Sequence, residues 1–381
     1  MSQIGCESRR GRFFPWAQSH ERRILPGYAR AASGKLIRRR RGSAAKGGIS
    51  VERVLKSGGI AGGHGIVDFG GVGADADSRG FTVGVAVSTR GAVVAGASDV
   101  AGAPSPARLA GLRPGDVITE IDGFPVESAA DLARELSGDR CTLTYQRNGE
   151  IRRVHVTPAF DRQTGGYKLG VLVRDSAAGI GTLTYYDPES GGYGALGHAI
   201  TDGDAGVVLP IRGGGIYENA LLGVEKGQSG RPGELTGQFV RESALGSIEE
   251  NSAYGIFGQA AGEMENSLYP QGLEAAGREQ MRTGSAGILC DVGQGIREYA
   301  CEIVRLEKQN SPAMRSFTIR VTDEALLKIT GGIVQGMSGS PVVQDGFLVG
   351  AVTHVYVDDP AMGYGVYLDW MLETARQAQA A

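Results

Sequence analysis

The chain has 381 residues, of which 62 are glycine and 7% are aromatic. This length allows two or three domains, and so much glycine favours turn-rich β domains over a helical bundle. No run of about 18 apolar residues is present, so the sequence predicts no membrane-spanning helix. No apolar core follows the N-terminal positive charges, as it would in a secretory signal.

The formal net charge of −3 is unevenly distributed along the chain. Residues 1–60 contain fourteen Lys and Arg against three Asp and Glu, which leaves 25 and 39 in the remaining 321 residues. Such a segment cannot bury enough apolar surface to order itself, so residues 1–60 are predicted to be disordered. A solvated or mis-assigned extension is the favoured interpretation, and attraction to nucleic acid or anionic lipid is the alternative. No nucleic-acid partner is expected. Glycine-rich residues 57–80 predict a linker, so residues 1–80 form one N-terminal segment.

The four cysteines are spread along the chain without a Cys-x-x-Cys pair, at Cys6, Cys141, Cys290 and Cys301. This spacing makes zinc unlikely to be bound, and we expect no metal and no cofactor. Cys290 and Cys301 flank a glycine-rich turn and could pair across neighbouring strands, but buried free thiols are the favoured interpretation.

Short β runs begin near residue 81 and lead into a run of recognisable turns. Residues 105–123 contain, in order, Ser-Pro-Ala, Ala-Gly-Leu, Gly-Asp-Val-Ile and a strand that ends in Ile-Asp-Gly. This stretch resembles a PDZ domain, so residues 81–160 are predicted to form one, with a second helix over 131–136.

The resemblance to a PDZ domain implies a peptide ligand. These domains bind an extended peptide as an added strand between a sheet edge and a helix. The loop that holds a terminal carboxylate is not recognisable before Phe81. An internal segment is therefore an alternative ligand, and a purely structural β domain is the alternative to binding.

Residues 161–355 continue as β-rich segments divided by glycine turns, which predicts a barrel or sandwich. Apolar residues then recur at helical spacing over 366–379, so one helix is predicted to close the chain. The fold is predicted to be mainly β.

The stretch Gly336-Met337-Ser338-Gly339-Ser340-Pro341 has the pattern found around the nucleophile of trypsin-like serine peptidases. Glycines allow such a loop to expose the Ser338 hydroxyl and to aim the backbone N–H groups of Gly336 and Ser338 at a developing oxyanion. Asp345-Gly346, between two apolar runs, predicts a tight hairpin directly afterwards. The alternative is a Gly/Ser turn without chemistry, because a motif this short is only a hypothesis.

A serine nucleophile requires a base, and the base requires an orienting partner. The candidate bases in the C-terminal region are His198, among small residues, and His354, at the end of a strand that leads away from Ser338. His198 is the favoured base. For His354, a core histidine satisfied by a backbone carbonyl is the favoured interpretation.

Three aspartates compete for the role of orienting acid. Asp323 follows a predicted strand and lies fifteen positions before Ser338. From the residues alone, a helix cap is as good an interpretation of Asp323 as catalysis. Asp202 is expected to hold a local turn, and Asp358 to be exposed.

These motifs together resemble the SpoIVB serine peptidase family (stage IV sporulation protein B). The resemblance rests on the order of a PDZ domain, Gly-His-Ala-Ile-Thr-Asp at 197–202, the motif at 331–341 and Ala-Val-Thr-His-Val at 351–355. It implies a chymotrypsin/trypsin-like double β-barrel peptidase domain over residues 161–381.

Residue by residue, the resemblance places the nucleophile on Ser338, the base on His198 and the acid on Asp323. It implies a serine endopeptidase in signalling between forespore and mother cell. The substrate would be a membrane-associated regulator of pro-sigma factor processing, and the PDZ domain would recognise a partner or this chain itself.

The same resemblance implies export to the space between the forespore and mother-cell membranes. Family members usually carry an N-terminal membrane-spanning or export segment, which residues 1–80 do not show. The alternative function is that of a catalytically silent, PDZ-containing interaction protein.

Overall fold

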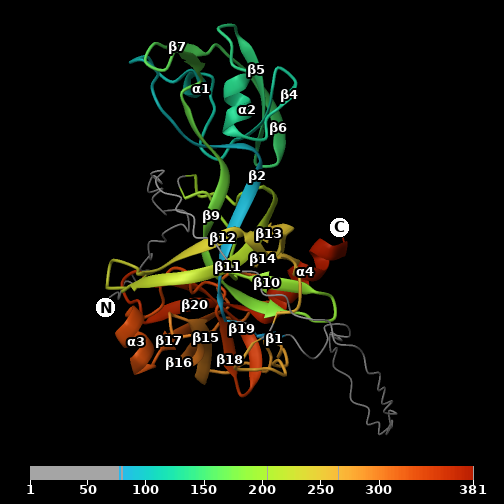
Figure 1. Cartoon of the computed structure of the whole chain (residues 1–381), viewed down its shortest axis with the longest axis vertical. Coiled ribbons are helices and arrows are strands. Elements are labelled where there is room, and N and C mark those ends of the chain that lie inside the picture. The colour runs from blue at the N-terminus through green and yellow to red at the C-terminus, as the bar shows by residue number, and fades with distance from the viewer. Residues whose placement is uncertain (1–76, 79, 204, 265, 381) are drawn as a thin grey trace, which may run out of the picture. The chain divides into compact units, whose positions relative to one another are not determined.

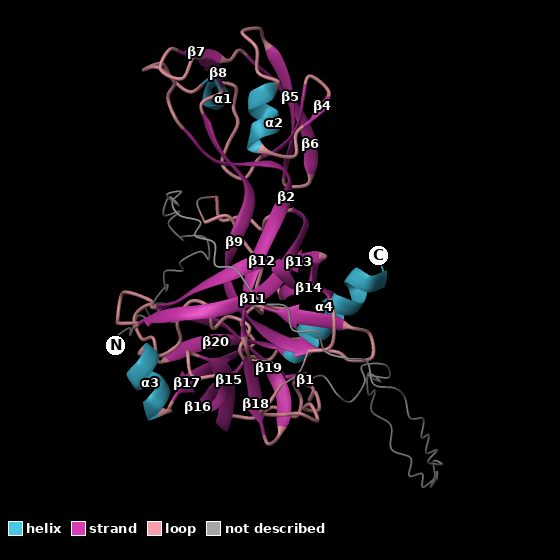
Figure 2. Cartoon of the chain, in the orientation of Figure 1, coloured by secondary structure: helices cyan, strands magenta, loops and turns pink. Residues whose placement is uncertain are grey.

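The computed structural model describes residues 77–78, 80–203, 205–264 and 266–380. The predicted disordered segment, most of the predicted linker and Cys6 lie outside the described residues. Strands make up about half of the described chain and far outnumber the helices, as Figure 2 shows. The mainly β fold predicted from the glycine content is confirmed.

The PDZ part packs two short helices against an antiparallel sheet (Figure 1). Both helices begin at a serine: the side chains of Ser105 and Ser128 accept backbone N–H groups of the first turn, and Pro106 follows Ser105. The elements of this part are α1 (Pro106–Leu109), β3 (Val117–Ile121), β4 (Phe124–Pro125), α2 (Ala129–Arg134), β5 (Cys141–Arg147), β6 (Glu150–Val156), β7 (Ala159–Asp161) and β8 (Gly166–Lys168).

Two long strands run through both the PDZ part and the peptidase part. β2 (Thr82–Ala97) and β9 (Val171–Tyr186) pair antiparallel, with an interruption of the register after Ser88. Residues 83–89 of β2 also pair with β11, and Val83, Val85 and Val87 pack into the peptidase core. Val94 packs into the PDZ core. Both parts therefore share these strands across the predicted boundaries at residues 81 and 160.

The first half of the peptidase part is a half-barrel sheet rather than a closed barrel. Short β1 (Asp77–Ser78) pairs with the end of β9. The sheet order runs β13-β14-β10-β9-β2, and β11 joins β2 to β12. The remaining strands are β10 (Gly192–Ala195), β11 (Ile211–Glu225), β12 (Glu234–Ile248), β13 (Glu250–Ser252) and β14 (Gly255–Gln259).

The second half is a closed barrel in the order β15-β16-β17-β20-β19-β18. Of the two barrels predicted, one is closed and the other is the half-barrel. The Asp345-Gly346 hairpin is confirmed, because both residues have positive φ and join β18 to β19. The elements are β15 (Gly284–Asp291), β16 (Ile296–Leu306), β17 (Phe317–Val321), α3 (Glu324–Thr330), β18 (Pro341–Gln344), β19 (Phe347–Val355), β20 (Met362–Tyr367) and α4 (Leu368–Ala380).

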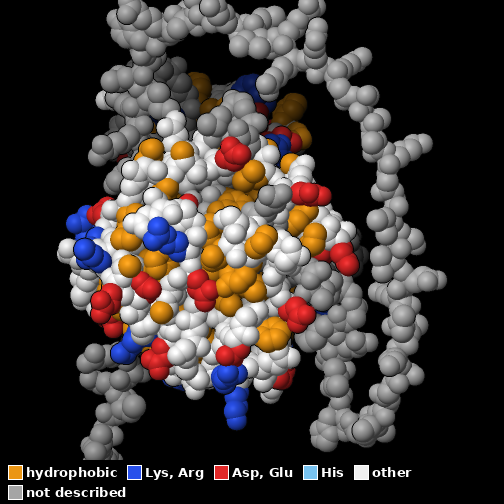
Figure 3. Space-filling model, turned by 60° about the horizontal axis from the view of Figure 1, so that its bottom comes forward, with side chains coloured by type: hydrophobic (Ala, Val, Ile, Leu, Met, Phe, Trp, Pro, Cys, Tyr) orange, Lys and Arg blue, Asp and Glu red, His pale blue; other side chains and the backbone are white. Residues whose placement is uncertain are grey.

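The predicted closing helix is α4, which starts two residues later than expected. Among the described residues, no helix is long and apolar enough to cross a membrane. Figure 3 shows one face of the molecule on which hydrophobic side chains gather in a central patch bordered by charged ones.

The cysteines of the barrel are free, buried thiols, so the favoured interpretation is confirmed. Cys290 lies opposite Arg297, and Cys301 lies opposite Ala286, so the two thiols do not face each other across β15 and β16. Burial raises the pKa of both thiols, that of Cys301 to about 12. Thiols held in the protonated form are poor nucleophiles.

Candidate active site

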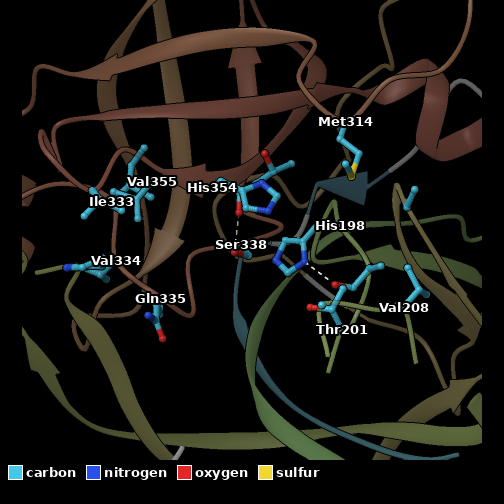
Figure 4. A pocket seen from close by; sticks show the side chains of 16 residues that line it. His198, Thr201, Val208, Met314, Ile333, Val334, Gln335, Ser338, His354 and Val355 are labelled. Carbon is cyan, nitrogen blue, oxygen red and sulfur yellow. Dashed lines mark hydrogen bonds between the residues drawn. The ribbon is translucent and has the colours of Figure 1, made fainter. Parts of the chain in front are cut away.

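Ser338, His198 and His354 line one cavity of about 380 Å³. Figure 4 shows the serine and the two imidazole rings next to one another among the other lining residues. Ser338 comes from the loop between α3 and β18, His198 from the loop after β10, and His354 from β19. Three segments that are far apart in the sequence therefore meet here.

The Ser338 loop is held by two threonines of β9. The Thr182 N–H donates to the Ser338 carbonyl at 2.9 Å, and the Thr182 hydroxyl donates to the Gly336 carbonyl at 2.8 Å. The Thr184 hydroxyl donates to the Gly339 carbonyl at 2.8 Å. Side chains of the half-barrel thus fix the backbone of a loop that belongs to the closed barrel.

Position 339 requires a glycine. Its φ is +95°, and an added Cβ would lie 2.0 Å from the Thr182 carbonyl oxygen. No side chain fits in that space, and a residue with a Cβ also disfavours this dihedral. The close approach of β9 thus explains the glycine that follows the serine in the motif.

The proposed oxyanion donors are the backbone N–H groups of Gly336 and Ser338. Within the described residues, neither group donates a hydrogen bond, whereas the N–H groups of Met337 and Gly339 donate to Val334 and Val352. Buried backbone donors are nearly always paired, so two such groups beside a cavity are suited to an incoming acceptor.

The Ser338 hydroxyl donates to the Thr353 carbonyl at 2.9 Å. Residues Val352 and His354 have partners on β20, but Thr353 lies at a shift of register between them. Such an irregularity turns the backbone away from the regular ladder. The hydroxyl must therefore leave this carbonyl, by rotation about the Cα–Cβ bond, before it can be deprotonated by a histidine.

His198 is held as a neutral base. Its Nδ1 lies 2.8 Å from the Ala199 carbonyl oxygen. A carbonyl only accepts, so Nδ1 carries the proton and Nε2 of the neutral ring is free to accept one. Burial lowers the pKa of His198, although the hydrogen bond to Ala199 opposes the shift. The ring is consequently uncharged at neutral pH, with Nε2 unprotonated, as a general base must be.

The His354 ring centroid lies 5.0 Å from that of His198. Burial, followed by the charges of His198 and Arg315, lowers the pKa of His354 to about 3. This ring is neutral throughout the physiological range, so it cannot compete with His198 for the serine proton. His354 is half-buried and lines the cavity. The sequence favoured a histidine inside the core, and the structure differs from that interpretation.

The sequence model of the SpoIVB peptidase S55 family matches residues 165–372, and a PDZ model matches residues 99–147. The chain belongs to the SpoIVB peptidase S55 family. The match covers Ser338, His198 and the barrel around them, so the predicted family and the order of its domains are confirmed.

Several curated proteins are similar to this chain over shorter stretches. A probable periplasmic serine endoprotease DegP-like of Brucella suis is 34% identical over 124 residues, which are 30% of this chain and 23% of that protein. A putative zinc metalloprotease of Neisseria meningitidis is 44% identical over 57 residues, 14% of this chain and 13% of that protein. The chain thus spans no more than about a quarter of the length of these two relatives.

The solved structures that match this chain include two proteases. The active form of the Rv3671c protease from M. tuberculosis is 16% identical, with a TM-score of 0.30 over 54% of this chain and 75% of that one. The HtrA-type protease AlgW with a decapeptide is 13% identical, with a TM-score of 0.33 over 78% of this chain and 63% of that one.

The S55 family resemblance assigns the orienting acid to Asp323, but the structure does not bring this residue to His198. Asp323 is the N-cap of α3: its Oδ1 accepts the Leu326 N–H at 3.0 Å, and its Oδ2 accepts the Ala300 N–H at 3.4 Å. It does not line the cavity. The helix-cap interpretation is confirmed, while the role as acid stays a prediction. In this arrangement, the Ala199 carbonyl is the group that orients the ring.

The two rival aspartates lie as the sequence predicts for this S55 peptidase. Asp358 is exposed. Asp202 closes a turn, because its Oδ1 accepts the Ala205 N–H at 2.6 Å. Among the described residues, no group of three His, Cys, Asp or Glu side chains could hold a metal ion.

Two features of this S55 peptidase were missed in the sequence. Asn251 is buried and fixes the His198 loop, since its amide accepts the Ile200 N–H at 2.8 Å and donates to the carbonyls of Ile200 and Leu209. The PDZ cavity is bordered by α2 and by residues 169–173. The sequence does contain a signal for a ligand-binding loop, namely Leu169-Gly170 directly before an apolar strand. This loop follows the second helix of the PDZ part, whereas the PDZ resemblance predicts it before Phe81.

Proposed function

We propose that this chain is a serine endopeptidase. The single observation that carries the proposal is that Ser338 and a neutral His198, whose Nε2 is free to accept a proton, line the same cavity. Among the residues that the structure describes, the backbone N–H groups of Gly336 and Ser338 have no acceptor, and both lie in the loop that carries the serine. A nucleophile, a base and an oxyanion site are the three parts that acyl transfer requires.

The reaction would begin when the Ser338 hydroxyl turns from the Thr353 carbonyl to His198. Nε2 takes the hydroxyl proton while Oγ attacks the peptide carbonyl carbon. The negative charge that forms on the carbonyl oxygen is stabilised by the N–H groups of Gly336 and Ser338. The protonated His198 then gives its proton to the leaving amine, and a water molecule repeats the sequence to release the acyl group.

The cavity favours an apolar residue next to the scissile bond. The side chains of Ile333 and Val334 are buried and line it, and Val355 and Val357 add further apolar surface. No Asp, Glu, Lys or Arg is among its described lining residues. A charged side chain would lose its hydration here without a partner, so peptides with Val or Leu at that position should be cleaved about 10-fold to 200-fold faster than those with Asp or Lys.

The experiment that tests the activity is labelling with a fluorophosphonate probe, which reacts with an activated serine. The full chain should be labelled, and Ser338→Ala should not. A parent that stays unlabelled while correctly folded would favour the second candidate, a catalytically silent PDZ-containing interaction protein. The cavity in the PDZ part is the observation behind that candidate.

We propose further, from the family, a role in sporulation signalling between forespore and mother cell. The chain would be exported to the space between the two membranes and would cleave a membrane-associated regulator of pro-sigma factor processing. The PDZ part would bind that partner or a segment of this chain. Replacement of the parent by Ser338→Ala in a sporulating host should stop the processing, and unaltered processing would contradict the role.

A further inference from the structure

The loop that carries His198 contains a carboxylate that the proposed mechanism does not use. Asp202 lies four residues after His198, and its side chain is fully buried. Besides the bond to Ala205, its backbone N–H donates to the Val207 carbonyl at 2.8 Å. Residues on both sides of Asp202 line the active-site cavity. The turn around Asp202 therefore sets the position of one wall of the active site.

The partner of this carboxylate comes from another strand. Arg174 Nε lies 2.5 Å from Asp202 Oδ2, and the Arg174 side chain is 32% exposed. A buried carboxylate is costly unless a positive charge accompanies it. Because Asp202 is buried and Arg174 reaches solvent, the arginine can be altered with less damage to the fold than the aspartate.

Arg174 lies in β9 at the junction between the two parts, directly after Val173, which packs against the PDZ core. It is paired with Val93 of β2. The residue before it, Val173, lines the PDZ cavity. The residue after it, Asp175, accepts the N–H of Ala129, the first residue of α2, at 2.9 Å. Three successive residues of one strand thus reach the PDZ cavity, the His198 loop and the helix that borders the PDZ cavity.

A second contact joins the same loop to the PDZ part. Val207 packs against the turn at Gly115, where an added Cβ would lie 3.0 Å from Val207 Cγ1. Gly115 belongs to the Gly-Asp turn of the PDZ resemblance. The His198 loop therefore contacts the PDZ part through an ion pair and through packing.

We propose that Arg174 and Asp202 are positioning residues for His198. Their ion pair holds the loop that begins at the histidine, and it makes the placement of the base depend on a strand that borders the PDZ cavity. Neither residue lines the active-site cavity, so both act through the loop. The inference rests on the proposed serine peptidase function.

The test compares Arg174→Met, which keeps most of the aliphatic stem but removes the charge, with the parent in the full chain. Arg174→Lys keeps a positive charge and serves as the conservative variant. Arg152→Met is the matched control, because Arg152 is a PDZ-part arginine whose ion pair with Glu150 is exposed. The measurements are the rate of fluorophosphonate labelling, kcat and KM for an apolar peptide, and the thermal unfolding temperature.

Labelling and kcat of Arg174→Met should fall about 10-fold to 100-fold, as expected when a base is misplaced, with KM within about twofold. Arg174→Lys should recover part of the loss, and Arg152→Met should match the parent. Two results would overturn the inference: Arg174→Met reacts like the parent, or it loses activity only together with its folded structure. If the parent itself is unlabelled, the proposed function fails first and this inference fails with it.

Discussion

The two loops that meet in the active-site cavity are held in different ways. The Ser338 loop is fixed through its backbone, by hydroxyl and N–H donors of β9 and by a glycine that tolerates no Cβ. The His198 loop is fixed through side chains, by the amide of Asn251 and by the ion pair of Asp202 with Arg174. The nucleophile thus depends on close backbone packing, and the base depends on buried polar contacts.

Because of this difference, substitutions should displace the two loops in different ways. Backbone packing against β9 leaves the Ser338 loop few alternative positions. Polar side-chain contacts can be exchanged or lost singly, so the His198 loop can shift while the barrel stays folded. Substitutions in each loop can therefore be tested separately.

The largest effect is expected from removing either reacting group. Ser338→Ala and His198→Ala should each lower kcat by roughly 10⁶-fold, because nucleophile and base act as one unit. The double variant should be hardly worse than either single variant, while circular dichroism and thermal unfolding stay unchanged. Losses that multiply in the double variant would show that the two residues do not act on the same step.

Asp323→Asn separates the two roles of this residue. Asn caps helices as well as Asp does, so thermal stability should change little, by no more than the loss of the long 3.4 Å hydrogen bond from the Ala300 N–H. The family resemblance predicts that single-turnover cleavage falls by about 10⁴-fold while binding changes little. Activity within a few fold of the parent would instead leave the Ala199 carbonyl as the group that orients His198. Asp358→Asn, an exposed aspartate, is the control and should behave like the parent.

Gly339→Ala tests the backbone packing of the Ser338 loop. The new Cβ meets the Thr182 carbonyl, so we expect the free energy of unfolding to fall by about 4 kcal/mol or more, together with activity. Gly346→Ala is the matched control, since Gly346 also has positive φ but nothing lies within 4 Å of an added Cβ. The control should lose only about 1–2 kcal/mol for the dihedral. Equal losses in denaturant unfolding would contradict the packing argument.

The smallest effect concerns His354 and pH. Its pKa is lowered in the folded chain, so the unfolded chain binds the proton more strongly, and stability is lost as pH falls from about 6.5 towards 3. His354→Leu removes this contribution. Between pH 7 and pH 5, the unfolding temperature of both proteins should decrease. The decrease should be a few degrees smaller for His354→Leu than for the parent. An identical decrease in both proteins would show that His354 is not the group responsible.

The nucleophile loop could be predicted well because local chemistry determines it. Gly336, Ser338, Gly339 and the Asp345-Gly346 hairpin each have a backbone conformation that follows from their own residue type and neighbours. The support of the His198 loop could not be predicted in the same way. Asn251 and Arg174 lie 53 residues after and 24 residues before His198. Nothing in their local sequence distinguishes them from surface polar residues.

The position of Asp323 shows the limit of a motif. Its spacing from Ser338 fits both a catalytic acid and a helix cap, and only the path of the chain decides where the carboxylate lies. The boundary at residue 160 could not be predicted for a similar reason. Residues 81–87 read as the first strand of the PDZ part, yet residues 83–89 pair with β11, more than 120 residues later.

The shared strands also bear on the order in which the chain folds during synthesis. The PDZ part is an insertion between the two strands of a peptidase hairpin, entered through β2 and left through β9. Its own core is complete once residue 173 has been made. Residues 83–89 gain their second neighbouring strand only after residues 211–218 have been made. Because domains that emerge first fold first, the PDZ part should be formed while the peptidase edge of β2 is still unpaired. A nascent chain would then carry a finished peptide-binding module before it carries an assembled active site.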